Sequence, residues 1–194
     1  MSLAQRVAHF NQHFQRIAQH TGRAPLALEE GVVVAGFHGM RLESTFDAVL
    51  DSTGAVLGYQ AQFHAFSPRG TRVSPRAPYA VALDADSIVD LDRLMRTLHV
   101  LNATAQDLGG LLFLDVHPWH IAQVSGDHGA VFEDILRECG RLPGTVVLQI
   151  TDAVVQEVDH LARAIASFQA RGFGIALHQR GTDAGELVQL LRLH

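Results

Sequence analysis

The sequence predicts an α/β protein built around a mostly parallel sheet, and two observations support this class. From Ala55 onward, apolar segments typical of strands alternate four times with segments typical of helices. The strand segments are apolar on both faces, as expected for parallel strands that helices cover on both sides. An eight-stranded βα barrel needs about 250 residues. A chain of 194 residues therefore predicts an open sheet or an incomplete barrel.

The first 30 residues predict a helix and a connector. Apolar residues recur at spacings of three and four, which places them on one face of an amphipathic helix that ends near Gly22: Leu3, Val7, Phe10, Phe14 and Ile17. The polar face of this helix carries only Arg6 and Arg16 as cations, too few to attract a lipid surface. We therefore divide the chain into residues 1–30, the helix with its connector, and residues 31–194, the α/β domain.

The remaining segments follow in the order that an α/β fold requires. Asp51-Ser52-Thr53-Gly54 separates two strand segments and predicts a hairpin. Residues 67–78, rich in Pro, Arg and Gly, predict a loop. Beyond a short strand candidate at 31–37, the sequence predicts a helix at 86–105, a strand at 110–116, a helix at 129–139, a strand at 144–150, a helix at 152–170, a strand at 173–177 and a last helix from about Asp183.

Composition excludes several classes of function. A net charge of −5 argues against nucleic-acid binding, which normally requires a basic face. No apolar run approaches the roughly 18 residues that span a bilayer, and the N-terminus lacks the apolar block of a signal peptide. Cys139 is the one cysteine, so no intrachain disulfide forms, and we expect a buried thiol. These features predict a cytoplasmic protein with no membrane partner.

Several segments resemble the motifs of EAL domains, the bacterial cyclic di-GMP phosphodiesterases. Residues 53–66, "TGAVLGYQAQFHAF", resemble the family segment T-G-x-V-V-G-Y-E-A-L-L-R, and "STFDAV" before the hairpin resembles S-x-x-Q-P-I. "FLDVHP" at 113–118 lies where the family has a strand ending in N-x-S. "LQITDA" at 148–153 resembles L-E-I-T-E, and "ALHQRGTD" at 176–183 resembles L-D-D-F-G-T-G. The resemblance covers about residues 42–194 and implies an incomplete, TIM-like βα barrel.

In that family, divalent metals at the strand ends activate a water that hydrolyses one phosphodiester of cyclic di-GMP. Carried over residue by residue, the resemblance implies that most of the required oxygens are replaced. The family's Glu, Leu and phosphate-contacting Arg of the first segment correspond to Gln60, Gln62 and His64, and its metal-binding Asn corresponds to Asp115. The two Glu residues of L-E-I-T-E correspond to Gln149 and Asp152, the Asp pair to His178 and Gln179, and the following Phe to Arg180.

Loss of these carboxylates predicts a protein that is not an enzyme and carries no cofactor, because a buried dication would lack compensating charge. The chain also stops at "LLRLH", where the family continues with three more strands. We therefore expect a degenerate, C-terminally truncated EAL domain that acts as a regulatory, protein-binding module. A sheet that stops before closure leaves an unpaired edge, which predicts a homodimer or another protein partner.

Two alternatives remain open at this point. The first is a sensor that binds cyclic di-GMP without hydrolysing it. Trp119 could then stack on a purine, and Arg180, ahead of a predicted helix, could contact a phosphate. The second is an enzyme with a substituted transition-metal site at Asp115, His117 and His178, with His120 close by in the sequence, because imidazole with carboxylate suits Zn²⁺ or Fe²⁺.

Overall fold

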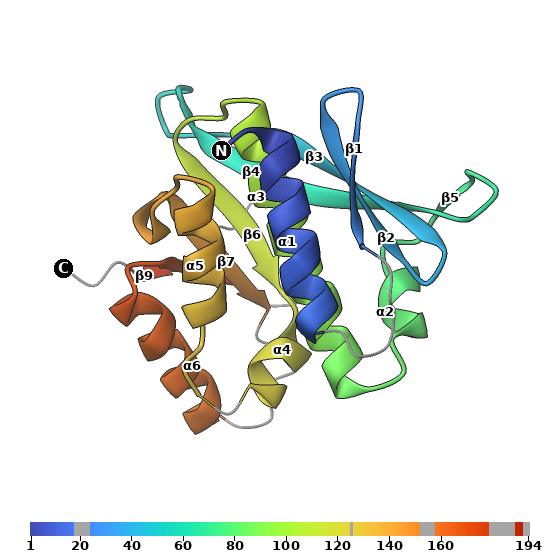
Figure 1. The fold of residues 1–194 in the computed structure, drawn as a ribbon. Coiled ribbons are helices and arrows are strands. Elements are labelled where there is room, and N and C mark those ends of the chain that lie inside the picture. Colours follow the sequence, from blue (N-terminus) through green and yellow to red (C-terminus); the bar gives the residue numbers. More distant parts are fainter. Residues whose placement is uncertain (18–23, 125, 152–157, 179–188, 192–194) are drawn as a thin grey trace. The chain divides into compact units, whose positions relative to one another are not determined.

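The structure is a computed structural model that describes residues 1–17, 24–124, 126–151, 158–178 and 189–191. Figure 1 shows the fold. The strands within these residues are β1 (Leu26–Glu29), β2 (Val32–Phe37), β3 (Met40–Leu50), β4 (Val56–Phe66), β5 (Arg72–Val73), β6 (Leu111–Val116), β7 (Val146–Thr151), β8 (Gly174–His178) and β9 (Gln189–Leu191). The helices are α1 (Leu3–Ile17), α2 (Ala77–Val81), α3 (Ala85–Ala105), α4 (Pro118–Gln123), α5 (Ala130–Glu138), α6 (Val158–Ala170) and a 3-10 helix, η1 (Pro143–Thr145). None of the described helices combines the length and the apolar character that crossing a membrane requires.

The strands form a mixed sheet of order β1-β2-β3-β4-β6-β7-β8-β9, with β5 paired to β4. Strands β4, β6, β7 and β8 are parallel neighbours. The pairs β1–β2, β2–β3, β4–β5 and β8–β9 are antiparallel. Within the described strands the order begins and ends at different strands, so the sheet is open. The predicted α/β class with an incomplete barrel is confirmed, although antiparallel pairs are more numerous than the sequence indicated.

The described chain divides into two compact units. Unit 1 consists of Met1–Asp47 and Ala61–Gly109, and unit 2 consists of Ala48–Gln60 and Gly110–His194. Both strands of the β3–β4 hairpin pass from one unit into the other, so the hairpin is covalently part of both. The boundary after residue 30 that the sequence indicates stays a prediction.

In unit 1, helix α1 covers the outer edge of β1. The predicted apolar stripe is confirmed at Val7, Phe10 and Phe14, which are buried. The Asn11 side chain accepts a hydrogen bond from the Leu26 N–H and donates one to the Leu26 C=O, both at 2.8 Å. Since β1 pairs with β2 alone, these are the groups that an additional strand would use. Asn11 therefore blocks strand addition at this point of the edge.

In the interior of unit 1, a side chain of α3 bonds to the backbone of β2, as Asn11 of α1 does to the backbone of β1. Strand β2 pairs with β3 only from Ala35 onward, so the backbone of Val33 has no strand on that side. The Asn102 side chain supplies both missing bonds, accepting from the Val33 N–H and donating to the Val33 C=O at 2.8 Å. At its start, α3 is capped by the Asp84 side chain, which accepts from the Ser87 N–H at 2.7 Å.

The interior of unit 2 is built on the parallel strands. Phe113, Val147 and Ala176, from β6, β7 and β8, form one buried apolar cluster. At the start of β6 the chain approaches β4 so closely that a Cβ on Gly58 would lie 2.0 Å from the Leu111 carbonyl oxygen. Cys139 is buried, as predicted for a core thiol.

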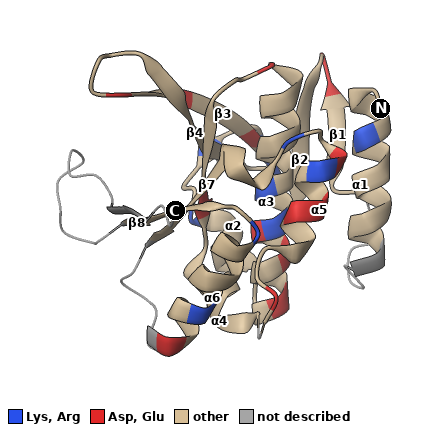
Figure 2. Cartoon of the chain, turned by 90° about the vertical axis from the view of Figure 1, so that its left-hand side faces the viewer, with Lys and Arg blue, Asp and Glu red and all other residues tan. Residues whose placement is uncertain are grey.

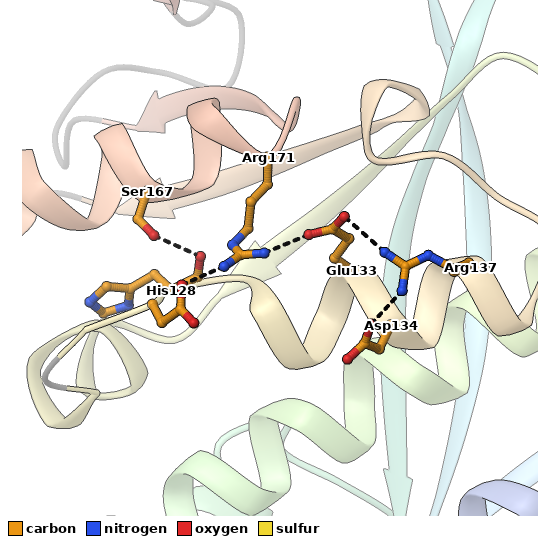
Figure 3. Close-up of polar contacts among 7 residues, drawn as sticks. His128, Glu133, Asp134, Arg137, Ser167 and Arg171 are labelled. Atoms are coloured by element: carbon orange, nitrogen blue, oxygen red, sulfur yellow. Dashed lines mark hydrogen bonds and ion pairs between the residues drawn. The ribbon is translucent and has the colours of Figure 1, made fainter.

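An ion-pair network joins α6 to α5 in unit 2 (Figure 3). Arg171, directly after α6, lies between Glu133 of α5, at 2.6 Å, and Asp127. The two carboxylates raise the pKa of its guanidinium. Arg137 contacts the same Glu133 at 3.1 Å and Asp134 at 2.6 Å. The network fixes the C-terminal end of α6 against α5, and with it the entry into β8.

The structure corrects the sequence interpretation at four places. The connector before residue 30 contains β1, whose backbone is paired with β2 and Asn11. The loop at 67–78 contains β5, because β4 extends far enough to pair with Arg72 and Val73. Between the predicted strand at 110–116 and the predicted helix at 129–139, the structure contains an additional helix, α4, with Pro118 in its first turn. The last helix was expected from Asp183, but Gln189–Leu191 form β9, which satisfies the edge of β8; residues 179–188 lie outside the described part.

Candidate functional site

The candidate site lies at the carboxyl ends of β6, β7 and β8 in unit 2. The register places Asp115 of β6 opposite Gln149 of β7, and Gln149 opposite Ala176 of β8. Alternate residues of a strand share a face. Asp115 and Gln149 therefore follow Phe113 and Val147 on one face of the sheet, one step nearer the strand ends. On this face, Phe113 and Val147 form an apolar floor. Nearer the strand ends lies the row Asp115, Gln149 and Ala176, which contains one carboxylate.

Gln149 differs from its neighbours in that it is both polar and buried. Its exposed fraction is 9%, and its Oε1 atom has no hydrogen-bond partner within the described residues. Leaving a buried acceptor without a partner costs about 1–3 kcal/mol. An orphaned oxygen on this face therefore indicates a place where a donor from a ligand would be accepted.

Gln60 occupies the adjacent row of the same face. It is the partner of Phe113 in the parallel β4–β6 ladder and is partly buried. Its position and that of Gln149 place two neutral amides beside the floor, with Asp115 as the exposed carboxylate. The register thus brings Gln60, Asp115 and Gln149 onto one face of the sheet.

Gln62 and His64 follow on β4, in unit 1, and both are bound to neighbouring strands. The Gln62 side chain donates to Asp47 of β3 at 2.8 Å. The Nε2 atom of His64 lies 3.0 Å from the Thr45 hydroxyl, and its Nδ1 lies 2.6 Å from an Arg72 guanidinium nitrogen. Sequence reasoning missed Arg72, because its contact with His64 depends on the two-residue strand β5, which no periodicity reveals.

Of the three residues proposed for a transition-metal site, the structure describes the side chains of Asp115 and His117, and the site stays a prediction. The described side chains include no group of three or more His, Cys, Asp or Glu residues suited to a metal ion. His117 is the N-cap of α4, and its Nδ1 accepts weakly from the Trp119 N–H at 3.3 Å. His120 is buried in α4, and Trp119 is 48% exposed. The third proposed ligand, His178, ends β8 opposite Thr151, and its side chain lies outside the described set.

Three further predicted residues cannot be placed. Asp152, Gln179 and Arg180 lie outside the described residues. The residue types alone still determine the charge available for a metal ion, because Asp152 is the one anionic residue among the three. The divalent metals of the resembled family therefore fit these positions poorly: Asp115 and Asp152 are the two carboxylates, and the described oxygens beside Asp115 are neutral amides. Hard cations require anionic oxygen ligands, so the donor set lacks the charge that such a site needs.

A second buried polar group lies in unit 1, within α3 and away from the predicted residues. Asp92 and Arg96 form an ion pair of 2.7 Å, with side chains about 3% exposed. One turn further, the Nδ1 atom of His99 lies 2.8 Å from the Ser44 hydroxyl. Burial lowers the pKa of His99 from 6.5 to about 4, against a smaller opposing effect of Asp92. His99 is therefore neutral at physiological pH, and its position inside the unit indicates a structural role.

Comparison with protein families identifies this arrangement of strands and strand ends. A model of the EAL domain matches residues 33–194 of the chain, with the site residues from Gln60 to Arg180 inside the match. No curated protein matches significantly.

Solved structures give the same fold at low sequence identity. Klebsiella pneumoniae BlrP1, as a calcium/cyclic diGMP complex, is 20% identical with a TM-score of 0.60, covering 75% of this chain and 36% of that one. BlrP1 with FMN and cyclic diGMP and no metal ions is 17% identical with a TM-score of 0.52, covering 79% and 36%. Bacillus subtilis YkuI, with cyclic di-GMP and calcium, is 18% identical with a TM-score of 0.58, covering 75% and 37%. This chain therefore spans well under half of the length of these solved chains.

Proposed function

Since the chain belongs to the EAL domain family, we propose that it is a catalytically inactive member that acts as a regulatory, protein-binding module in cyclic di-GMP signalling. One observation carries this proposal. The row at the carboxyl ends of β6, β7 and β8 reads Asp115, Gln149 and Ala176, and so contains a single carboxylate.

The net charge of the side chains in that row determines whether the site can bind a catalytic metal ion. Metal-assisted hydrolysis of a phosphodiester needs a cation that activates water and stabilises the developing charge. The Gln149 oxygen is available, because it has no partner within the described residues, but an amide does not neutralise a dication. Transferring a poorly compensated charge into a site beside Phe113 and Val147 is unfavourable. The site therefore supports binding better than catalysis.

The test is an assay of cyclic di-GMP hydrolysis with Mg²⁺ or Mn²⁺, in which chromatography measures the linear product. We expect no product above the protein-free blank. The double variant Gln60→Glu/Gln149→Glu provides a comparison, because it restores two carboxylates to the same face. We expect titration calorimetry to detect Mn²⁺ binding to this variant and none to the unmodified chain. Turnover by the unmodified chain would disprove the proposed inactivity.

A sensor that binds cyclic di-GMP without hydrolysing it is the second candidate. The observation that favours it is the structure of BlrP1 with cyclic diGMP and no metal ions, in which that relative holds the nucleotide without a metal. Calorimetric titration of the unmodified chain with cyclic di-GMP distinguishes the candidates. Micromolar affinity selects the sensor, and the absence of binding at millimolar nucleotide selects the protein-binding module.

The identity of the protein partner is a separate question. The sequence argument for a homodimer rested on the edge left unpaired where the sheet stops before closure. In the structure β9 pairs with β8 there, and at the first strand of the sheet α1 covers the edge of β1 at Leu26. This edge of unit 1 therefore no longer favours a second copy of the chain. We propose a protein partner, and the molecular mass in solution, measured by light scattering, determines whether that partner is another copy.

A further inference from the structure

The segment that follows β4 contains the tripeptide Ser-Pro-Arg twice, at residues 67–69 and 74–76. Each copy begins the same turn. In 67–70 and in 74–77, the N–H of the fourth residue donates to the C=O of the first, at 2.8 and 2.9 Å. Proline at the second position fixes φ in the range that such turns require. The arginine at the third position is therefore held in an exposed turn in both copies.

Three arginines of this segment have no carboxylate partner within the described residues: Arg69, Arg72 and Arg76. All three are exposed. Five other described arginines pair with Asp or Glu on the same unit. Figure 2 colours the Lys and Arg segments of the chain blue and its Asp and Glu segments red. The arginines with such partners are Arg41, Arg93, Arg96, Arg137 and Arg171. Residues 67–76 thus form a cationic surface on a chain whose net charge is −5.

Arg72, the second of the three arginines, is held in position by a contact with the imidazole of His64 and not by a carboxylate. Arg72 Nη2 lies 2.6 Å from Nδ1 of His64. A guanidinium only donates, so Nδ1 accepts and the proton of the imidazole resides on Nε2, which lies 3.0 Å from the Thr45 hydroxyl. This arrangement orients Arg72 without cancelling its charge and leaves most of its N–H donors for a ligand.

Exposed apolar side chains follow the three arginines in the chain. Arg76 directly precedes α2, which ends at Val81 and is followed by Leu83. Val81 is 37% exposed and Leu83 90%. A helix of this length rises about 8 Å, so Arg76 and the exposed residues at the end of α2 lie within reach of one short peptide. Arginine beside large apolar residues is the composition typical of the energetically important centre of protein interfaces.

We infer that residues 67–83 are the docking surface for a short protein segment that carries Asp or Glu residues together with apolar side chains. This inference rests on the proposed protein-binding function and names the chemistry of its partner. Carboxylates complement guanidinium groups in charge and hydrogen bonding, as the pairs Arg41–Glu29 and Arg171–Glu133 of this chain illustrate. The apolar residues of the partner segment would cover Val81 and Leu83.

A short acidic segment fits this surface better than an extended polyanion. Nucleic acid or an anionic membrane would extend past three arginines and meet a protein whose net charge is −5. A peptide contacts the cationic surface alone. The attraction also steers encounter with the partner, so binding will weaken as salt rises.

The experiment uses the full chain and a fluorescein-labelled peptide that alternates Glu and Leu, with fluorescence anisotropy as the readout. Matched peptides carry Gln or Lys in place of Glu. The variants Arg69→Glu and Arg76→Glu are compared with Arg163→Glu, which makes the same charge change at an exposed residue of α6. Single-stranded DNA and phosphatidylserine vesicles serve as competing anionic probes.

We expect the Glu peptide alone to bind. Its dissociation constant should rise about tenfold with Arg69→Glu or Arg76→Glu and change less than about twofold with Arg163→Glu. Equal weakening by Arg163→Glu, no binding of the Glu peptide, or tighter binding of DNA or vesicles would each overturn the inference. None of these results alters the hydrolysis assay, because the substitutions lie outside Gln60, Asp115 and Gln149. Failure of this inference is therefore distinguishable from failure of the proposed function.

Discussion

The hydroxyl of Ser44 and the Nδ1 atom of His99 lie 2.8 Å apart and join β3 to the middle of α3 in unit 1. The imidazole also contacts the ring of Phe46, with centroids 6.4 Å apart. A histidine that is 6% exposed and packed in this way has to remain uncharged. This relationship makes the stability of the fold depend on pH.

Stability should fall as the pH decreases from about 6.5 to about 4. In the folded state the pKa of His99 is about 4, whereas in the unfolded chain it is near 6.5. The unfolded state therefore binds a proton first, and the stability present above pH 6.5 is lost as the pH falls through this interval. A shift of this size corresponds to a loss of up to about 3 kcal/mol, measured by urea unfolding at successive pH values.

The control is His99→Gln, whose side chain still reaches Ser44 but does not titrate. We expect this variant to be less stable at pH 7 and to show a smaller decrease between pH 6.5 and pH 4. Parallel decreases in the variant and the unmodified chain would show that other groups cause the effect.

Replacing Asn102 should destabilise the protein more than replacing Asn11. Asn102→Ala removes two 2.8 Å bonds to Val33 and leaves a buried N–H and C=O without partners, at a cost of about 3 kcal/mol. Asn11→Ala removes an equivalent pair of bonds to Leu26, but these are only partly buried, and water replaces them at a cost of about 1 kcal/mol. Chemical unfolding compares the two directly, and equal losses would contradict the role of burial.

Gly58 should tolerate no larger residue. A Cβ at this position would lie 2.0 Å from the Leu111 carbonyl oxygen, a backbone atom that moves only if β4 and β6 separate. We expect Gly58→Ala to cost about 3 kcal/mol or more, or to prevent folding. The matched variant is Gly109→Ala, since a Cβ there meets nothing within 4 Å. Thermal unfolding of Gly109→Ala should change little, and equal losses in both variants would disprove the close-approach argument.

The sequence predicted the parallel part of the fold well, for a physical reason. Strands β6, β7 and β8 are short apolar runs between amphipathic helices, and burial on both faces produces that pattern directly. The sequence named Asp115 and Gln149 as candidate site residues only through the family resemblance, and the register of β6 and β7 that places them in one row comes from the structure.

The sequence did not reveal the elements that depend on local pairing. Strand β1 is the run Leu-Ala-Leu-Glu, which has no strand propensity of its own and is stabilised by β2 and Asn11. Strand β9 lies where the sequence predicted a last helix, and its pairing with β8 is a tertiary effect. The contact of Arg72 with His64 depends on β5 in the same way. Propensity cannot predict such pairs, because each partner is defined only once the other is in place.

Gln149→Met should stabilise the protein by about 1 kcal/mol. Methionine has a similar volume and removes the buried oxygen that has no partner within the described residues. The matched variant Gln60→Met, on the same face, should be neutral or destabilising, because Gln60 has no buried side-chain atom left without a partner in the described residues. Urea unfolding measures both. A gain at Gln149 alone would mean that the chain keeps an unfavourable polar group at the polar end of its strands, as expected of a residue that accepts a hydrogen bond from a ligand. A loss at Gln149 would show instead that its amide is satisfied in solution, and the site would then offer no vacant acceptor.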